Sequence, residues 1–344
     1  MNIIDVRSDT VTRPTAQMLE AMFSAKVGDD VFGEDETVNT LQQKAAELFG
    51  MEAALFCSSG TLTNQLAIKL HTQPADEVIC SSLAHIYLYE GGGIAFNSGA
   101  SVRLLYGERG MFTAEQVMNN INNPADVHFP VTRMVAVENT MNKGGGCCWD
   151  MEELKRIKQV CVDKGLAFHL DGARLFNALV AKKESAKDYG KLFDTISICL
   201  SKGLGAPVGS LLLGTQEHIS KARRLRKVMG GGMRQAGYLA AAGIYALDHH
   251  VERLTEDHIK AAKLEKSLQQ LNYIDFILPV ETNIVIFKLK PEITPDTFTS
   301  YLLKNNIKAS SMGNGLFRMV MHLDITAEQF DYLEQAICSF TIAS

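Results

Sequence analysis

Residues 195–205 read TISICLSKGLG, an apolar run that passes into a glycine-containing turn at Lys202. The run has the length of a buried β-strand and is typical of a parallel sheet that is covered on both faces. A lysine ammonium is strongly hydrated and is rarely buried without a reason. Lys202 is therefore either a nucleophilic amine in a shielded site or a packed stem whose charged head reaches water.

Strand and helix patterns alternate over most of the chain, and this alternation predicts an α/β fold. Residues 53–70 indicate a strand, a tight turn and a helix. Residues 37–50 predict a helix with Thr37 as its N-cap and Gly50 as its stop. Further strands are expected at 133–138, 166–170, 194–200 and 208–213, and a helix is expected at 150–164.

The pattern changes after residue 215, where helical stretches follow one another and a smaller unit then begins. The predicted elements are helices at 216–228, 233–248 and 252–271, a strand at 284–288, a helix at 294–305, a strand at 316–321 and a helix at 326–338. We expect an N-terminal arm (1–14), a large domain (15–250) and a small C-terminal domain (251–344).

The composition narrows the classes of function. The chain has 344 residues, 46% of them hydrophobic, and a net charge of −5, which argues against a nucleic-acid-binding face. No apolar run reaches the roughly 18 residues of a membrane span, and the first residues do not resemble a signal peptide. The seven cysteines contain no C-x-x-C pair. We therefore expect a cytoplasmic protein with reduced thiols, no structural metal, and no nucleic-acid or membrane partner.

Two further motifs carry chemistry. The SSGT turn at 58–61 lies between a predicted strand and a helix, where backbone N–H groups and the helix dipole bind anions; the alternative is an ordinary capped turn. Asp171 ends a hydrophobic strand, and its buried carboxylate needs a cationic partner. That partner is either Arg174, in a structural salt bridge, or a protonated ring nitrogen of a cofactor.

The order of these features is informative. An anion-binding turn, a strand-end aspartate and a later strand-end lysine describe, in that order, a pyridoxal phosphate site. In such a site the turn holds the phosphate, Asp171 pairs with the pyridine nitrogen and Lys202 forms the Schiff base. Neither a G-x-x-x-x-G-K-[ST] loop nor a strand followed by G-x-G-x-x-G occurs, which counts against a P-loop or a dinucleotide fold.

Longer motifs resemble those of a known family. They are DVRSDTVTRPT (5–15), VGDDVFGEDETV (27–38), FCSSGTLTNQLA (56–67), HIYLYEGGG (85–93), HLDGARLFNA (169–178), SICLSKGLGAPVGSLLLG (197–214) and GGGMRQAG (230–237). With these motifs the chain resembles the low-specificity L-threonine aldolases of the aromatic amino-acid β-eliminating lyase/threonine aldolase superfamily. The resemblance implies the aspartate aminotransferase-like fold (fold type I), with a mostly parallel central sheet flanked by helices and a smaller C-terminal α+β domain.

The resemblance also assigns residues to pyridoxal 5′-phosphate. Lys202 corresponds to the Schiff-base lysine, Asp171 to the partner of the pyridine nitrogen, and Arg174 to a ligand of the ring oxygen. His85 is expected to stack on the ring. Ser59, Gly60 and Thr61 are expected to hold the phosphate, and Arg234 to reach a phosphate in a neighbouring subunit.

For the substrate, the resemblance implies that Ser8 and Arg318 bind the carboxylate, with Arg174 nearby. His128 corresponds to a family histidine near the substrate hydroxyl; without the resemblance it would be read as a surface-loop residue. The general base is then His128 or a water held by His85. One departure is Met141, where family members often carry a histidine.

The implied activity is that of a lyase. It cleaves L-threonine, L-allo-threonine and related β-hydroxy-α-amino acids between Cα and Cβ, and releases glycine and acetaldehyde or the corresponding aldehyde. The family implies a homotetramer, a dimer of dimers with shared active sites. One alternative is another pyridoxal phosphate-dependent enzyme of the superfamily: a β-eliminating lyase, a racemase or an aminotransferase. A second is a binding protein that has kept the fold without the chemistry.

Overall fold

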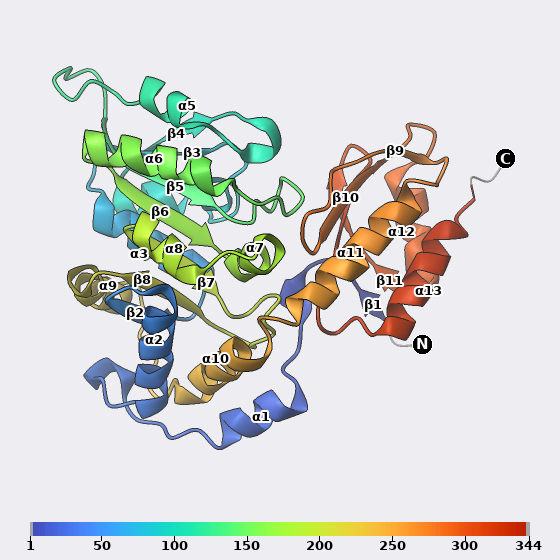
Figure 1. Ribbon diagram of the computed structural model, residues 1–344, viewed down its shortest axis with the longest axis horizontal. Helices are drawn as coiled ribbons and strands as arrows, with labels where there is room; N and C mark the ends of the chain where they lie inside the picture. The colour runs from blue at the N-terminus through green and yellow to red at the C-terminus, as the bar shows by residue number, and fades with distance from the viewer. Residues whose placement is uncertain (1–2, 342–344) are drawn as a thin grey trace.

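The computed structural model describes residues 3–341 and contains two hydrophobic units (Figure 1). The larger unit is built on a seven-stranded sheet in the order β2-β8-β7-β6-β5-β3-β4. These strands span Ala53–Cys57, Ser210–Gly214, Thr195–Cys199, Ala167–Gly172, Val131–Glu138, Asp76–Ser81 and Ser101–Leu105. β8 runs antiparallel to both of its neighbours and the other pairings are parallel, so the predicted α/β class with a mostly parallel sheet is confirmed.

Helices cover both faces of this sheet, because successive strand residues point to opposite sides. Phe56 of β2 belongs to the core on the side of α2, α6, α7, α8 and α10, whereas its neighbour Leu55 packs with α3 and α9 on the other side. These helices span Glu36–Phe49, Met151–Lys164, Leu175–Lys182, Ala186–Leu192, Gly237–His249, Gly60–His71 and Gln216–Val228. The shorter helices α1, α4 and α5 span Ala16–Phe23, His85–Leu88 and Ala114–Asn119.

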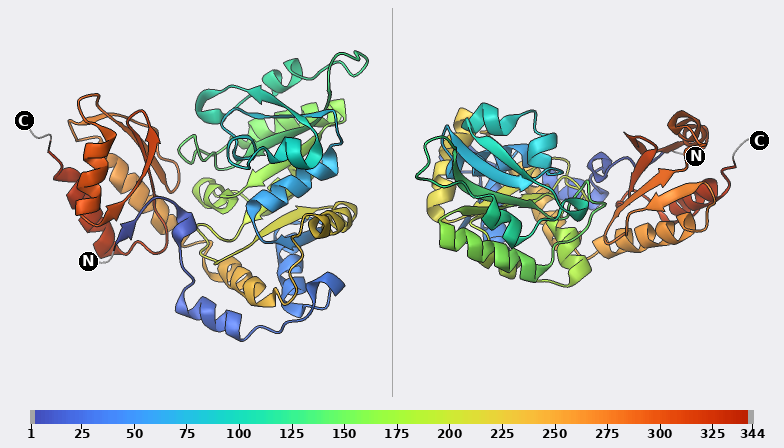
Figure 2. Two further views of the ribbon diagram at one scale, coloured as in Figure 1. Left: turned by 180° about the vertical axis from the view of Figure 1, so that it is seen from behind. Right: turned by 90° about the horizontal axis from the view of Figure 1, so that it is seen from above.

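The smaller unit is a four-stranded antiparallel sheet in the order β12-β13-β10-β9, with α11, α12 and α13 packed in its core. Its strands are Ser310–Gly313, Leu316–Val320, Ile284–Leu289 and Ile274–Ile277, and its helices are Leu254–Leu268, Pro295–Lys304 and Ala327–Cys338. Figure 2 shows this unit to one side of the large one. The separate cores support the proposed division of the chain near residue 250.

The N-terminal arm joins the two units. Its strand β1 (Ile4–Asp5) pairs in parallel with β11 (Ile307–Lys308) of the small unit, and the chain then crosses to α1 on the large unit (Figure 1). The arm is therefore packed against both units. Within the described residues, no helix is both long and apolar enough to cross a lipid bilayer.

The predicted helix boundaries are largely confirmed, with two corrections. Asp35, not Thr37, caps α2, and its Oδ1 accepts a hydrogen bond from Val38 N at 3.0 Å. The helix expected at 233–248 begins at Gly237, whose N–H donates to Asp35 Oδ2 at 2.9 Å. One buried carboxylate thus caps two helices, whereas the residues next to each helix start indicate only a local N-cap.

This double cap leads to a stability prediction. Asp35→Ala removes acceptors from the ends of two helices, so we expect the free energy of unfolding to fall by about 2–4 kcal/mol in a urea titration. Thr37→Ala is the matched control, since it removes a single hydrogen bond from Thr37 Oγ1 to Lys26 O and should cost about 1 kcal/mol. An equal or larger loss in the Thr37 variant would contradict the assignment of Asp35 as the cap.

Candidate active site

A cavity of about 490 Å³ opens between the two units at the carboxyl ends of β5, β6 and β7. In an α/β sheet this edge is where ligands bind. The cavity is lined by Ser8, Thr10, His85, Tyr89, Glu138, Asn142, Lys143, Ala173, Arg174, Lys202, Ser310, Ser311, Met312 and Arg318. Five residues that the sequence assigned to the site, Ser8, His85, Arg174, Lys202 and Arg318, therefore meet in one place.

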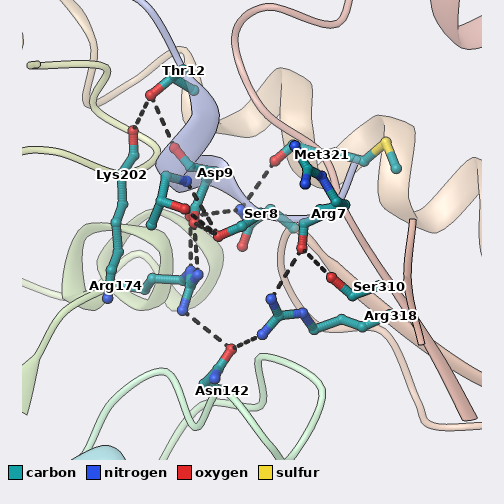
Figure 3. Close-up of polar contacts among 12 residues, drawn as sticks. Arg7, Ser8, Asp9, Thr12, Asn142, Arg174, Lys202, Ser310, Arg318 and Met321 are labelled. Carbon is teal, nitrogen blue, oxygen red and sulfur yellow. Dashed lines mark hydrogen bonds and ion pairs between the residues drawn. The ribbon is translucent and has the colours of Figure 1, made fainter. Parts of the chain in front are cut away.

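Lys202 lies three residues after the end of β7 and lines the cavity. Its backbone is fixed, because its carbonyl oxygen accepts hydrogen bonds from Gly205 N at 2.8 Å and from Thr12 Oγ1 at 3.2 Å (Figure 3). Within residues 3–341 no hydrogen bond or ion pair engages its Nζ atom. The amine is thus available to an aldehyde that enters the cavity.

Asp171 is the penultimate residue of β6 and is 2% exposed. Its Oδ2 accepts a hydrogen bond from Asn64 Nδ2 at 3.0 Å, and its Oδ1 accepts one from Ala173 N at 3.2 Å. The sequence left two partners open for this carboxylate, and the structural salt bridge with Arg174 is wrong, because Arg174 pairs with another acid. The other partner expected from the sequence, a protonated ring nitrogen of a cofactor, stays a prediction.

The acid that holds Arg174 is Asp9, a fully buried residue of the N-terminal arm. Arg174 Nε donates to Asp9 Oδ2 at 2.8 Å and Nη2 donates to Oδ1 at 2.6 Å (Figure 3). Burial alone would raise the pKa of Asp9, but the guanidinium of Arg174 outweighs it and holds that pKa at about 2. Asp9 is far from Arg174 in the sequence and was not predicted as its partner, although a buried arginine implies an acceptor.

Two guanidinium groups converge on Asn142. Arg318 Nη1 donates to Asn142 Oδ1 at 2.8 Å, and Arg174 Nη1 donates to the same oxygen at 3.4 Å (Figure 3). Arg318 Nη2 also donates to the Arg7 carbonyl at 3.0 Å. Burial, together with the nearby charge of Arg174, lowers the pKa of Arg318. An oxygen atom held between two arginines marks where an anionic group is favoured.

His85 begins α4 and is oriented by two acids. Its Nδ1 lies 3.0 Å from Glu90 Oε1, and its backbone N–H donates to Glu138 Oε2 at 2.7 Å. Burial alone would lower the pKa of His85, but the hydrogen bond to Glu90 outweighs it, so that pKa is raised. Burial and the charge of Asp171 raise the pKa of Glu138 to about 7. Glu138 is a second site residue to which the sequence analysis assigned no role.

The residues expected to bind the phosphate lie at the same edge of the sheet, but they do not line the cavity. Ser59 is the N-cap of α3, and its Oγ accepts a hydrogen bond from Leu62 N at 3.2 Å. Ser59 and Thr61 are exposed. A Cβ at Gly60 would lie 2.6 Å from Cys199 Sγ, so a glycine is needed where α3 begins beside the end of β7. Exposed N–H groups at a helix start fit a phosphate.

The structure does not bring two predicted residues to this cavity. His128 precedes β5, so it lies at the sheet edge opposite Glu138, about 26 Å away for eight residues of strand. Its side chain is 85% exposed and pairs with Asp126 at 2.8 Å. Within one chain His128 is therefore a surface-loop residue away from its own cavity, and its place near the substrate stays a prediction. Arg234 is 74% exposed, and its Nε lies 3.8 Å from Asp29 Oδ2.

Met141, the departure from the family pattern, is fully buried. It forms an isolated bridge with Cys147 and packs near Gly110 rather than lining the cavity. Tyr89 lines the cavity, with its ring centroid 5.7 Å from that of His85.

Comparisons with known proteins agree with this geometry. Residues 5–291 match the model of the beta-eliminating lyase family. The low specificity L-threonine aldolase of Escherichia coli K12 is 42% identical over 328 residues, which cover 95% of this chain and 96% of the bacterial protein. The low-specificity L-threonine aldolase 1 of Arabidopsis thaliana is 38% identical over 338 residues, which cover 96% of this chain and 94% of the plant protein.

Solved structures share the fold. The threonine aldolase of Leishmania major aligns with a TM-score of 0.84 at 22% identity, and the alignment covers 97% of this chain and 98% of that one. A putative L-allo-threonine aldolase of Listeria monocytogenes aligns with a TM-score of 0.81 at 18% identity, over 97% and 95% of the two chains. Together with the sequence identities, these matches place the chain in the pyridoxal phosphate-dependent beta-eliminating lyase family, among the low-specificity L-threonine aldolases.

Proposed function

We propose that this protein is an aldehyde-lyase that cleaves L-threonine, L-allo-threonine and related β-hydroxy-α-amino acids to glycine and an aldehyde. One observation carries the proposal: the free amine of Lys202 and the guanidinium of Arg318 face the same cavity. The first group suits an aldehyde cofactor and the second suits an amino-acid carboxylate. The relatives named above carry this activity in their names.

The residues present fit pyridoxal 5′-phosphate. Lys202 would hold its aldehyde covalently, Asp171 would pair with its ring nitrogen, His85 would stack on its ring, and the turn at Ser59, Gly60 and Thr61 would hold its phosphate. When bound, the cofactor withdraws electrons from Cα of an attached amino acid, so that a Cα bond perpendicular to its ring breaks most easily.

The side chains of the cavity would determine which Cα bond lies perpendicular to the ring. Arg318, Ser8 and the remaining N–H of Arg174 would bind the substrate carboxylate where Asn142 Oδ1 now lies. A carboxylate fixed at this point turns the rest of the amino acid, so that the Cα–Cβ bond takes the perpendicular position. The hydroxyl proton would then pass to His85 or to a water held by it, since His85 Nδ1 is engaged by Glu90 and Nε2 remains free.

The proposed assembly is a homotetramer in the cytoplasm, a dimer of dimers with shared sites. Arg234 and His128 are both exposed and lie away from their own cavity, so a role for either one requires a neighbouring subunit. The second candidate activity is β-elimination, which the description of the matched family favours. The two activities differ in the bond that is held perpendicular to the ring.

Lys202 provides the first test. Lys202→Ala should lower the release of glycine and acetaldehyde from L-threonine and L-allo-threonine by at least about a thousandfold, because the covalent attachment is lost. Lys143→Ala is the matched control, as another cavity lysine without an assigned role, and should stay within a few-fold of the parent protein. Release of pyruvate or ammonia by the parent protein would favour β-elimination, and borohydride labelling away from residue 202 would refute the attachment.

Arg318 provides a test of the carboxylate site. Arg318→Lys keeps the charge but loses the two-pronged contact, so KM for L-threonine should rise roughly 10- to 100-fold in steady-state assays. The control is Arg7→Lys, because the Arg7 side chain is exposed and pairs with Asp5 outside the cavity. An unchanged KM in the Arg318 variant would place the substrate carboxylate elsewhere.

A further inference from the structure

A chain of buried polar side chains runs through the large unit behind Asp171. It begins at His71 and passes through Thr195 and His169 to Asn64, which contacts Asp171. Three of these residues, Thr195, His169 and Asn64, are at most 1% exposed. A buried polar group is costly unless it is hydrogen-bonded, so this path is a built feature of the core.

Asn64 lies on α3, and its side-chain amide donates hydrogen bonds to two acidic side chains. Its Nδ2 donates to Asp171 Oδ2 at 3.0 Å and to Glu90 Oε1 at 2.9 Å. Glu90 is in turn the partner of His85. Asn64 therefore connects the carboxylate assigned to the edge of the cofactor ring with the histidine assigned to its face.

The amide orientation of Asn64 is fixed from behind. Its Oδ1 lies 3.2 Å from His169 Nε2, which donates because the oxygen can only accept. Burial lowers the pKa of His169 to about 4, so the ring is neutral and carries one N–H. With that N–H on Nε2, Nδ1 accepts from the Thr195 hydroxyl at 2.9 Å, and it also lies 3.2 Å from the Thr195 carbonyl oxygen. His71 Nε2 lies 3.2 Å from the same hydroxyl. A reversed amide would direct Oδ1 at two carboxylates.

Asp171 and Glu90 lie in a crowded acidic cluster, and the Asn64 amide is a hydrogen-bond donor to both of them. A ring nitrogen of His85 and one carboxylate oxygen each of Glu90 and Asp171 lie within 4.8 Å of one another. Glu138 lies beside Asp171 in the neighbouring strand. Like charges repel one another in a buried cluster. An amide that donates one N–H to each carboxylate offsets part of this repulsion and fixes the positions of both groups.

We propose that Asn64 is a positioning residue for the cofactor. It holds the Asp171 carboxylate aligned toward the ring nitrogen and ties that carboxylate to the Glu90–His85 pair. The inference rests on the proposed function, because it requires Asp171 to meet that nitrogen. Asn64 contacts neither substrate nor ring and acts through Asp171. The path of His169, Thr195 and His71 holds it in the donating orientation.

The test compares Asn64→Leu with Gln65→Leu. Gln65 is the next residue of α3, is also buried and donates to Glu90 Oε2 at 2.7 Å, without contacting Asp171. Each protein is titrated with pyridoxal phosphate, and the ring-nitrogen signal of isotope-labelled cofactor is recorded by NMR. In Asn64→Leu we expect the dissociation constant to rise about 10- to 100-fold and the signal to move toward the unprotonated ring. In Gln65→Leu the ring-nitrogen signal should stay in place.

A third variant, Asp171→Asn, separates the positioning role of Asn64 from the proposed function on which it rests. A change in Asp171→Asn without a change in Asn64→Leu overturns this inference and leaves the proposed function intact. No change in either variant overturns the role of Asp171 itself. An equal signal shift in Gln65→Leu also overturns the inference, since the effect would then not act through Asp171. If Asn64→Leu does not fold, Asn64→Ala also removes the amide donor, adds no charge and carries the same expectation.

Discussion

The site depends on one buried ion pair, that of Asp9 with Arg174. Asp9 belongs to the arm whose first strand pairs with the small unit, and Arg174 follows β6 of the large unit. Both side chains are almost completely buried, so removal of either partner would leave an uncompensated charge, at a cost of about 3–5 kcal/mol. The pair therefore holds the arm, and with it Ser8, against the edge of the large sheet.

This ion pair also limits how the cavity can bind an anion. Arg174 Nε and Nη2 donate hydrogen bonds to Asp9, so mainly the Nη1 group of Arg174 is left to bind a substrate. Arg318 comes from the small unit, and its Nη1 is held only by a neutral amide oxygen, that of Asn142. Under the proposed function, the small unit would supply the main carboxylate ligand, Arg318, and the large unit would supply Lys202. The distance between these groups depends on how the two units pack, both through the arm and through direct contacts such as Arg109 Nη1 to Glu281 Oε1 at 2.6 Å.

The sequence predicts the part of this design that follows from strands. Apolar runs locate β5, β6, β7 and β8, and parallel strands bring their carboxyl ends together, so the convergence of Asp171 and Lys202 can be inferred from the order of the strands along the chain. Pairings between distant segments leave no such periodic signal. Asp9 and Arg174 are 165 residues apart, and Asp35 caps a helix that begins at Gly237, so neither contact could be predicted from local patterns.

Strand direction also explains why His85 lines the cavity of its own chain whereas His128 does not. A residue that follows a strand of a parallel sheet reaches the ligand edge, whereas a residue that precedes one lies at the opposite edge, and His128 precedes β5. Motif matching does not use this distinction, because it reads spacing along the chain and not direction in the sheet. The path from His71 to Asn64 had no signal in the sequence for a related reason, since its members come from α3, β6 and β7. Strand direction therefore decides which residues meet the ligand, and the polar contacts between elements decide how those residues are held.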